Sequence, residues 1–305
     1  GTYHTQKKLN QFAQKSDILA RDFSFIDANE LQPAVIDRSN PLHLWMNIAV
    51  NKGSIAGRYE ANVIVETSNK EIVVGVIAIN VLDVVLPVSK YTHGVYYRGK
   101  LTEDNKAWIS SEFKSEQQLD ADLKDIYKHG INTVLSYQPI DARKKYKNYL
   151  PGQIDDLFEK YLKIKRRYDG QSAELFYLGI TTSSTKKMDT YRAKLDKLKK
   201  LASKYGYSDI YIYGIDEATG KELVQQKSMW AATHQSSIKI IAAGKKDLYF
   251  NMYDHGDVFI IQDKRGIIRQ GSKRLLEYSN PQSGVENPYH YRYKRGIRIW
   301  QNDYN

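Results

Sequence analysis

Apolar positions after residue 90 alternate between two periods. Short runs of β-branched and aromatic residues, typical of strands, are followed by stretches in which apolar residues recur every three or four positions, typical of amphipathic helices. The clearest helix begins at Ser115, where Gln118 completes a capping box, and ends at Gly130 with Leu119 and Leu123 on one face. This alternation predicts parallel strands connected by helices.

Eight apolar runs fit the strand pattern in this part of the chain. They are His93–Tyr97, Ile131–Tyr137, Glu174–Ile180, Asp209–Ile215, Ile238–Ala242, Asp257–Ile261, Leu275–Ser279 and Ile297–Trp300. An open doubly wound sheet alternates in the same way, but the count of eight and the lack of a Gly-rich phosphate turn after the first strand favour a closed barrel. We therefore predict an α/β fold, with a (β/α)8 TIM-type barrel over residues 90–305.

Residues 1–89 show a different pattern. The runs Leu42–Val50, Arg58–Glu66 and Glu71–Val88 are rich in β-branched residues and are separated by turn residues, with no strong helical period between them. This pattern predicts a β-sandwich-like domain, incomplete at its N-terminal edge, before the barrel. We place the exit from the first domain at Pro87-Val88.

Composition narrows the chemistry. The chain has 24 tyrosines against 8 phenylalanines and 4 tryptophans. Tyrosine suits sugar-binding clefts, which are part apolar and part hydrogen-bonding, although a tyrosine-rich core explains the surplus equally well. The absence of cysteine excludes disulfides, zinc fingers and thiol catalysis. Because the histidines are scattered without ligand spacing, we predict no metal and no cofactor.

The formal net charge of +11 raises the question of nucleic acid. However, lysines such as Lys194, Lys197 and Lys204 fall opposite apolar positions, as on a solvated helix face, and no nucleic-acid motif accompanies them. We expect no nucleic-acid partner and a stronger attraction to acidic glycans or cell surfaces. No apolar run approaches the roughly 20 residues that cross a bilayer, so we predict no transmembrane segment.

Active sites of such barrels lie at the C-terminal ends of the strands. The residues at these predicted ends combine aromatic, amide and carboxylate side chains, which together stack on sugars and hydrogen-bond their hydroxyls. Polar loop ends are common in any barrel, so this composition is suggestive rather than decisive. The predicted substrate-binding residues are Tyr137, Gln138, Tyr177, Tyr213, Tyr278, Asn280, Trp300 and Asn302.

The fourth predicted strand runs directly into two adjacent carboxylates, Asp216 and Glu217, which we predict to be the catalytic pair. A carboxylic acid held near apolar and aromatic groups keeps its proton at neutral pH and can protonate a leaving group. In the alternative interpretation, Asp216 caps the following helix and Glu217 supports its first turn. Spacing alone does not decide between the two.

Several segments resemble, in order and spacing, glycoside hydrolases that have an N-terminal β-sandwich and a barrel. They are Ile131–Pro139, Phe176–Thr182, Tyr211–Ala218 and Tyr278–Val285, with Asn40–Trp45 and Gly57–Tyr59 in the sandwich region. The nearest resemblance is to glycoside hydrolase family 123 and its uncharacterised relatives, from about Asn40 onward.

That resemblance implies a substrate-assisted, retaining hydrolysis of a 2-acetamido sugar, in which the acetamido oxygen attacks the anomeric carbon. Glu217 would be the general acid and later the base, and Asp216 would orient the acetamido group. Tyr278 would hydrogen-bond the acetamido oxygen, and Trp300 would form a platform for the sugar.

We therefore expect a secreted glycoside hydrolase, extracellular or at the cell surface, that acts on N-acetylhexosamine-containing glycans. One alternative uses Glu277 as a nucleophile in ordinary double displacement, although the pattern of Leu275 and Tyr278 turns Glu277 outward. The other is a non-catalytic surface-layer, filament or adhesin subunit that self-assembles or binds glycans, because one fold supports many functions.

Overall fold

The computed structural model describes residues 48–51, 53–67, 69–85, 89–102, 112–141, 149–170, 174–182, 187–262, 267, 271–278, 293 and 301. By their internal contacts the described residues fall into two units, one that ends at Ser89 and one that begins at Lys90. The assignment of residues 1–89 and 90–305 to separate domains stays a prediction.

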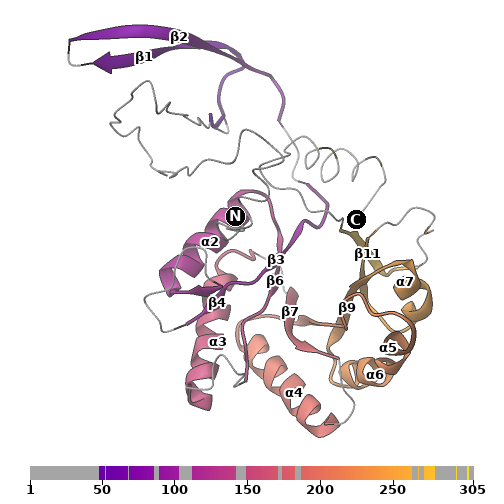
Figure 1. Cartoon of the computed structure of the whole chain (residues 1–305). Coiled ribbons are helices and arrows are strands. Elements are labelled where there is room, and N and C mark those ends of the chain that lie inside the picture. Colours follow the sequence, from indigo (N-terminus) through magenta and orange to yellow (C-terminus); the bar gives the residue numbers. More distant parts are fainter. Residues whose placement is uncertain are drawn as a thin grey trace, which may run out of the picture. The chain divides into compact units, whose positions relative to one another are not determined.

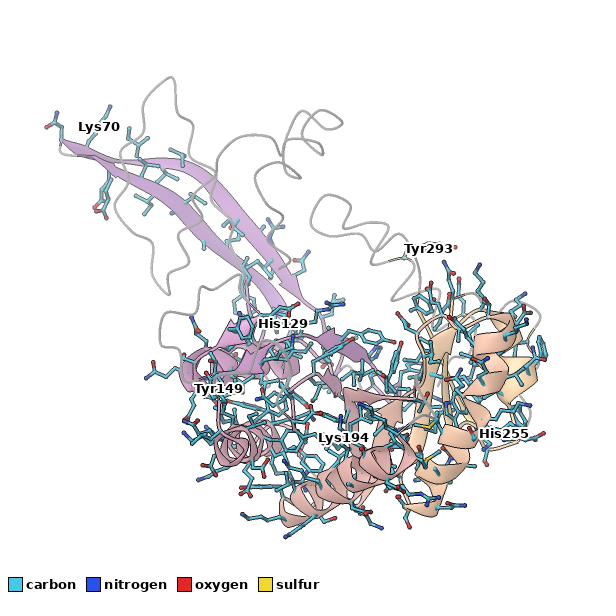
Figure 2. All side chains as sticks on the ribbon, turned by 60° about the horizontal axis from the view of Figure 1, so that its bottom comes forward. Lys70, His129, Tyr149, Lys194, His255 and Tyr293 are labelled. Atoms are coloured by element: carbon cyan, nitrogen blue, oxygen red, sulfur yellow. The ribbon has the colours of Figure 1, made fainter. Side chains whose placement is uncertain are left out.

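The first unit contains an antiparallel hairpin of β1 (Gly57–Thr67) and β2 (Lys70–Val81). Its register runs from Gly57 opposite Val81 to Thr67 opposite Lys70, which lies at the tip of the hairpin (Figure 2). The two strands were expected from their β-branched residues and from the turn between them. A β-bulge interrupts the register between Val63 and Ile64.

The predicted β-sandwich is wrong for the described part of this unit, which holds one two-stranded ribbon rather than two packed sheets. A sandwich covers one face of each sheet with the other sheet. On this ribbon, Val73, Val74 and Val76 remain 56%, 58% and 60% exposed. Alternating apolar residues predict that a strand forms, but they do not specify how many other strands pair with it or cover it.

The second unit is built on a parallel sheet whose strands lie in the order β11-β10-β9-β8-β7-β6-β3. In chain order these strands are β3 (Gly94–Tyr97), β6 (Thr133–Ser136), β7 (Glu174–Thr181), β8 (Asp209–Tyr213), β9 (Lys239–Gly244), β10 (Val258–Ile261) and β11 (Arg274–Glu277). Two short strands, β4 (Lys100–Leu101) and β5 (Phe113–Lys114), pair separately.

The helices lie outside the curve of this sheet (Figure 1). They are α2 (Glu116–Lys128), α3 (Pro151–Arg166), α4 (Met188–Lys204), α5 (Gly220–Gln225), α6 (Lys227–Gln235) and α7 (Lys246–Met252). The capping box of α2 forms as predicted: Ser115 Oγ accepts from the Gln118 amide at 3.2 Å, and Gln118 Oε1 accepts from the Ser115 amide at 3.0 Å. Helices α5 and α6 are divided at Gln226.

The prediction of a closed eight-stranded barrel is wrong for the described residues. They form seven sheet strands, and β3 and β11 stand at the two ends of the order without a bond between them. The run predicted as the eighth strand, Ile297–Trp300, lies outside the described residues. Alternating strands and helices specify parallel neighbours, but they do not specify that the first and last strands meet.

The two faces of the sheet have separate apolar clusters, because side chains alternate along each strand. In β7, Leu175 and Tyr177 point outward and pack with the helices, whereas Phe176 and Leu178 point inward. The inner cluster contains Leu135, Phe176, Leu178, Tyr211, Tyr213, Ile241, Ala243, Val258 and Ile260. Burial on both faces explains why the strands are continuous apolar runs.

An ion pair across the inner face shows how strongly the sheet curls. Arg274 of β11 donates to both carboxylate oxygens of Glu174 in β7, at 2.9 and 3.0 Å. Four strand spacings separate these strands, about 19 Å along a flat sheet, which is farther than the two side chains reach. The Arg274 guanidinium also lies over Phe176, which stacks on Tyr211 with ring centroids 4.5 Å apart.

A buried polar cluster on the outer side ties α3 to the start of β8. Lys165 Nζ donates to both oxygens of Asp169 at 2.7 and 2.8 Å, and the Tyr207 hydroxyl donates to Asp169 at 2.5 Å. Tyr127 also donates to Asp169. Burial lowers the pKa of Lys165, while the neighbouring Asp169 carboxylate opposes this shift. Because the charge is paired and hydrogen-bonded, it is tolerated in the core.

Arg274→Met is expected to lower the free energy of unfolding by about 1–3 kcal/mol, because the Glu174 carboxylate loses both hydrogen bonds from Arg274 while it stays on the inner face. Urea unfolding of Arg274→Met, Glu174→Gln and the double variant measures the coupling of the pair. Arg167→Met, which removes an exposed pair with Asp120, is the control and is expected to change stability little. Strictly additive losses would contradict the proposed role of the ion pair.

Candidate functional site

The C-terminal ends of four strands bring tyrosines around two carboxylates. We call this group the tyrosine–carboxylate site; its members are Tyr96, Tyr137, Tyr213, Asp216, Glu217 and Tyr278. All four tyrosines belong to the inner cluster or pack against it, so they face the concave side of the sheet. Asp216 and Glu217 are exposed.

The turn after β8 presents both carboxylates at the same edge. The chain stays bonded to β9 beyond the end of β8, since the Gly214 amide donates to Ile241 O at 2.9 Å and the Glu217 amide to Ala243 O at 3.0 Å. Glu217 has φ 50°, a left-handed conformation that is uncommon for a residue other than glycine. This bend breaks the strand alternation that would otherwise send neighbouring side chains to opposite faces.

The helix-capping interpretation of Asp216 is wrong. Helix α5 begins at Gly220, and its N-cap residue is Thr219. Asp216 lies before the cap and accepts a hydrogen bond from Tyr213 instead. The pair of carboxylates is therefore not explained by the start of the helix.

Two tyrosines form a directed chain of hydrogen bonds to Asp216. The Tyr213 hydroxyl donates to Asp216 Oδ1 at 2.8 Å, and the Tyr96 hydroxyl lies 3.2 Å from that of Tyr213. Because Tyr213 gives its one proton to the carboxylate, Tyr96 is the donor in the second contact. Burial raises the pKa of both tyrosines far above the usual value, so they remain neutral donors. The chain orients Asp216 as a carboxylate.

Glu217 has a separate tyrosine partner. The Tyr278 hydroxyl, just after β11, donates to Glu217 Oε1 at 2.5 Å. Burial and then this hydrogen bond raise the pKa of Tyr278, so it too stays a neutral donor. Strands β9 and β10 lie between β8 and β11, and the contact therefore depends on the curl of the sheet.

A buried glutamine holds the turn from below. Gln226 is 1% exposed, and its Oε1 accepts from the Ile215 amide, the Thr182 hydroxyl and Trp230 Nε1, each at 3.0 Å. A Cβ atom at Gly214 would lie 3.0–3.2 Å from Trp230, Ala242 and Gln226, so a larger residue here requires these neighbours to move by a few tenths of an ångström. No sequence pattern singled out Gln226, because a buried glutamine between two helices has no motif of its own.

Two further residues at this edge, Tyr96 and Arg98, are not among the predicted site residues. Arg98 follows β3, and its guanidinium lies over the Tyr137 ring, 5.6 Å from the ring centroid. Burial raises the pKa of Tyr137, while the Arg98 charge opposes this shift and the Asp216 charge adds to it. The stacking with an aromatic from the next strand is not visible in the sequence.

Two predicted substrate-binding residues are not brought to the concave face. Gln138 is buried and bonds both backbone groups of Leu101, accepting from its amide at 2.6 Å and donating to its carbonyl at 3.3 Å. Tyr177 is buried in the outer cluster and donates to Gln138 O at 2.7 Å. Both act as supports for the loops behind the site. Asn280, Trp300 and Asn302 lie outside the described residues.

Glu277, the alternative nucleophile, lies on the other face of the sheet. Along β11, Leu275 belongs to the outer cluster, whereas Leu276 and Tyr278 pack with the inner one. The alternation therefore turns Glu277 away from Glu217. Double displacement with this pair, which needs carboxyl groups about 5 Å apart, has no support from the geometry.

Within the part of the chain that the structure describes, no three His, Asp or Glu side chains are grouped so as to hold a metal ion. Among the described helices, none has the length and apolar character required to cross a membrane. No protein-family model matches the chain, and no curated protein matches its sequence.

Gln226→Leu is expected to lower the free energy of unfolding by about 2–4 kcal/mol, because the donors on Ile215 and Thr182 lose the Gln226 acceptor, while Trp230 Nε1 keeps its bond to Thr182 Oγ1. Chemical unfolding followed by tryptophan fluorescence measures the change. Gln235→Leu, at the exposed end of α6, is the matched control with an expected change near zero. A Gln226→Leu protein as stable as the parent would show that the turn is not held in this way.

Proposed function

We propose that this chain is a glycoside hydrolase that cleaves N-acetylhexosamine-containing glycans at the tyrosine–carboxylate site. One observation carries the proposal: two adjacent exposed carboxylates, at the C-terminal edge of a parallel sheet, each receive a tyrosine hydrogen bond from a different direction. Carboxylates in different environments can take different roles in one reaction. The resemblance of Tyr211–Ala218 to glycoside hydrolase family 123 supports the same assignment.

Glu217 is the proposed general acid. In this role its protonated carboxyl group faces the glycosidic oxygen of the bound sugar and donates to it. Once Glu217 gives its proton to the leaving oxygen, the Tyr278 hydrogen bond at 2.5 Å stabilises the carboxylate that forms. The same carboxylate then accepts a proton from the water that completes hydrolysis.

Asp216 is the proposed orienting carboxylate. In a substrate-assisted reaction the acetamido oxygen forms a bond to the anomeric carbon as the leaving oxygen departs, and positive charge develops on the acetamido group. A carboxylate beside the acetamido N–H aligns the group and stabilises that charge. The chain from Tyr96 through Tyr213 holds Asp216 in one orientation, so little reorganisation is needed during reaction.

The tyrosines also suit the proposed ligand. Their rings offer apolar surface to the C–H faces of a sugar, and their hydroxyls offer donors and acceptors to its polar groups. Tyr137 and Tyr278 are partly exposed at the edge of the concave face and are therefore the proposed sugar contacts. We further propose that the glycan is extracellular, since polymers of this class are found at cell surfaces.

A panel of chromogenic glycosides, led by β-N-acetylgalactosaminide and β-N-acetylglucosaminide, tests the reaction. Glu217→Gln is expected to lower kcat by about 10²–10⁴-fold on the substrate that is cleaved, because it removes the general acid. Glu277→Gln is the matched control and is expected to keep the parent activity. Silence of the folded parent protein across the panel and on natural oligosaccharides, with sugar binding retained, would favour the non-catalytic glycan-binding alternative.

Tyr213→Phe is expected to lower kcat about 10–100-fold with little change in KM, because Asp216 loses the hydrogen bond that orients it. Tyr211→Phe is a matched control, since Tyr211 lies two residues earlier on the same inner face and bonds Glu174 at the far end of the strands. Steady-state kinetics on the best substrate of the panel compares the two. Equal losses in both variants would argue against a specific role for the tyrosine chain.

A further inference from the structure

Arg98 lies on the concave side of the sheet next to the tyrosine–carboxylate site. In β3, Val95 and Tyr97 pack outward with the helices, whereas Tyr96 packs inward. Continued alternation turns Arg98 inward, and its guanidinium stacks on Tyr137, an inner-face residue of the neighbouring strand end. A cation is therefore placed on the concave face that also carries the two carboxylates, at the β3 side of that face.

The ion pair with Glu112 does not neutralise the positive charge of Arg98. Glu112 is bonded mainly to Lys100, whose Nζ lies 2.6 Å from Oε2, while Arg98 Nη1 lies 3.5 Å from Oε1. The Arg98 side chain is 68% exposed, against 17% for Lys100. One carboxylate shared by two cations leaves a net positive charge, and the exposed member is Arg98.

Stacking makes this arginine suited to recognition. A guanidinium that rests on an aromatic ring has its planar edge free to donate two parallel hydrogen bonds, the geometry that carboxylates and sulfates accept. Tyr137 also restricts the side chain, which reduces the entropy lost when a ligand binds. The formal net charge of +11 favours the approach of an acidic polymer over longer distances.

We propose that Arg98 binds an anionic group, a hexuronate carboxylate or a sulfate, on the sugar next to the one cleaved at Asp216 and Glu217, so that the preferred substrates are acidic glycans. This inference rests on the proposed glycosidase function, which determines which sugar of the glycan lies at which residues. The carboxylates act on the N-acetylhexosamine, and Arg98 selects its neighbour. The separation of the cation from the two acids along the sheet edge keeps the anionic group away from their charges.

The test compares three oligosaccharides of equal length. One alternates N-acetylhexosamine with hexuronate, one is an N-acetylhexosamine oligomer with 6-O-sulfate, and one is the neutral oligomer. For Arg98→Gln we expect the ratio of kcat/KM on the better acidic oligosaccharide to kcat/KM on the neutral one to fall about 10–100-fold, the loss of a charge-assisted bidentate contact. Arg98→Lys is expected to recover part of the ratio, because it keeps the charge without the planar fork.

Arg166→Gln is the matched control. Arg166 also stacks on a tyrosine, Tyr207, with its guanidinium 5.4 Å from the ring centroid, but at the end of α3 and the start of β8. This variant removes the same charge away from the strand ends that carry the site, so the parent ratio is expected. The two acidic oligosaccharides distinguish a carboxylate ligand from a sulfate ligand: the one whose kcat/KM falls more in Arg98→Gln carries the group that Arg98 binds.

Hydrolysis of a neutral chromogenic N-acetylhexosaminide by the parent protein separates the two proposals. If the parent protein hydrolyses neither this glycoside nor any of the three oligosaccharides, the proposed function fails, and calorimetric titration of the same oligosaccharides into parent and Arg98→Gln proteins still tests the anion site. An acidic preference that Arg98→Gln removes, in turnover or in binding, supports the inference. No acidic preference in the parent, or the same preference in Arg98→Gln, overturns it.

Discussion

The candidate site depends on the curl of the parallel sheet. Tyr278 after β11 reaches Glu217 after β8 only because the strands between them bend toward a common axis. The paired contacts of Glu174 and Arg274 bridge the same side of the sheet at the opposite ends of the strands. A flat sheet of the same order would hold these pairs too far apart to bond. Because parallel strands twist, a parallel sheet can curl, and these contacts determine how far this sheet curls.

The side chains of the inner face differ from one end of the strands to the other. Those at the N-terminal ends and in the middle stabilise the sheet, and those at the C-terminal ends form the candidate site. At the N-terminal ends, charged side chains are paired over stacked aromatic rings, as with Arg274 over Phe176. In the middle, Leu178, Ile241 and Ile260 close the interior without polar atoms. At the C-terminal ends, tyrosines replace aliphatic residues and the carboxylates emerge. The apolar middle layer therefore separates the charged groups at the two ends of the strands. Residues in the loops after the strands can vary, and with them the chemistry, while this layer stays the same.

Much of this arrangement was predictable from sequence, for a physical reason. Burial on both faces makes parallel strands continuous apolar runs, so β7, β8, β9 and β10 stand out, and capping chemistry locates α2. The position of Asp216 and Glu217 follows from the end of the β8 run. Closure of the barrel did not follow, because it depends on whether the two outer strands meet. The role of Gln226 did not follow from the sequence either. The burial of Tyr177 did not follow, since one residue of register decides which face of the sheet a side chain joins.

Tyrosine as the partner of both acids has a consequence for the charge of the site. An arginine or lysine hydrogen-bonded to Asp216 or Glu217 would neutralise it, whereas tyrosines whose pKa is raised by burial donate without bringing a charge. Asp216 thus remains oriented and yet keeps its negative potential, which the proposed reaction with its developing positive charge on the sugar requires. Arg98 does not neutralise the acids either, because its guanidinium lies over the Tyr137 ring instead of pairing with Asp216 or Glu217. Its charge then remains available to the acidic glycan that we propose as substrate.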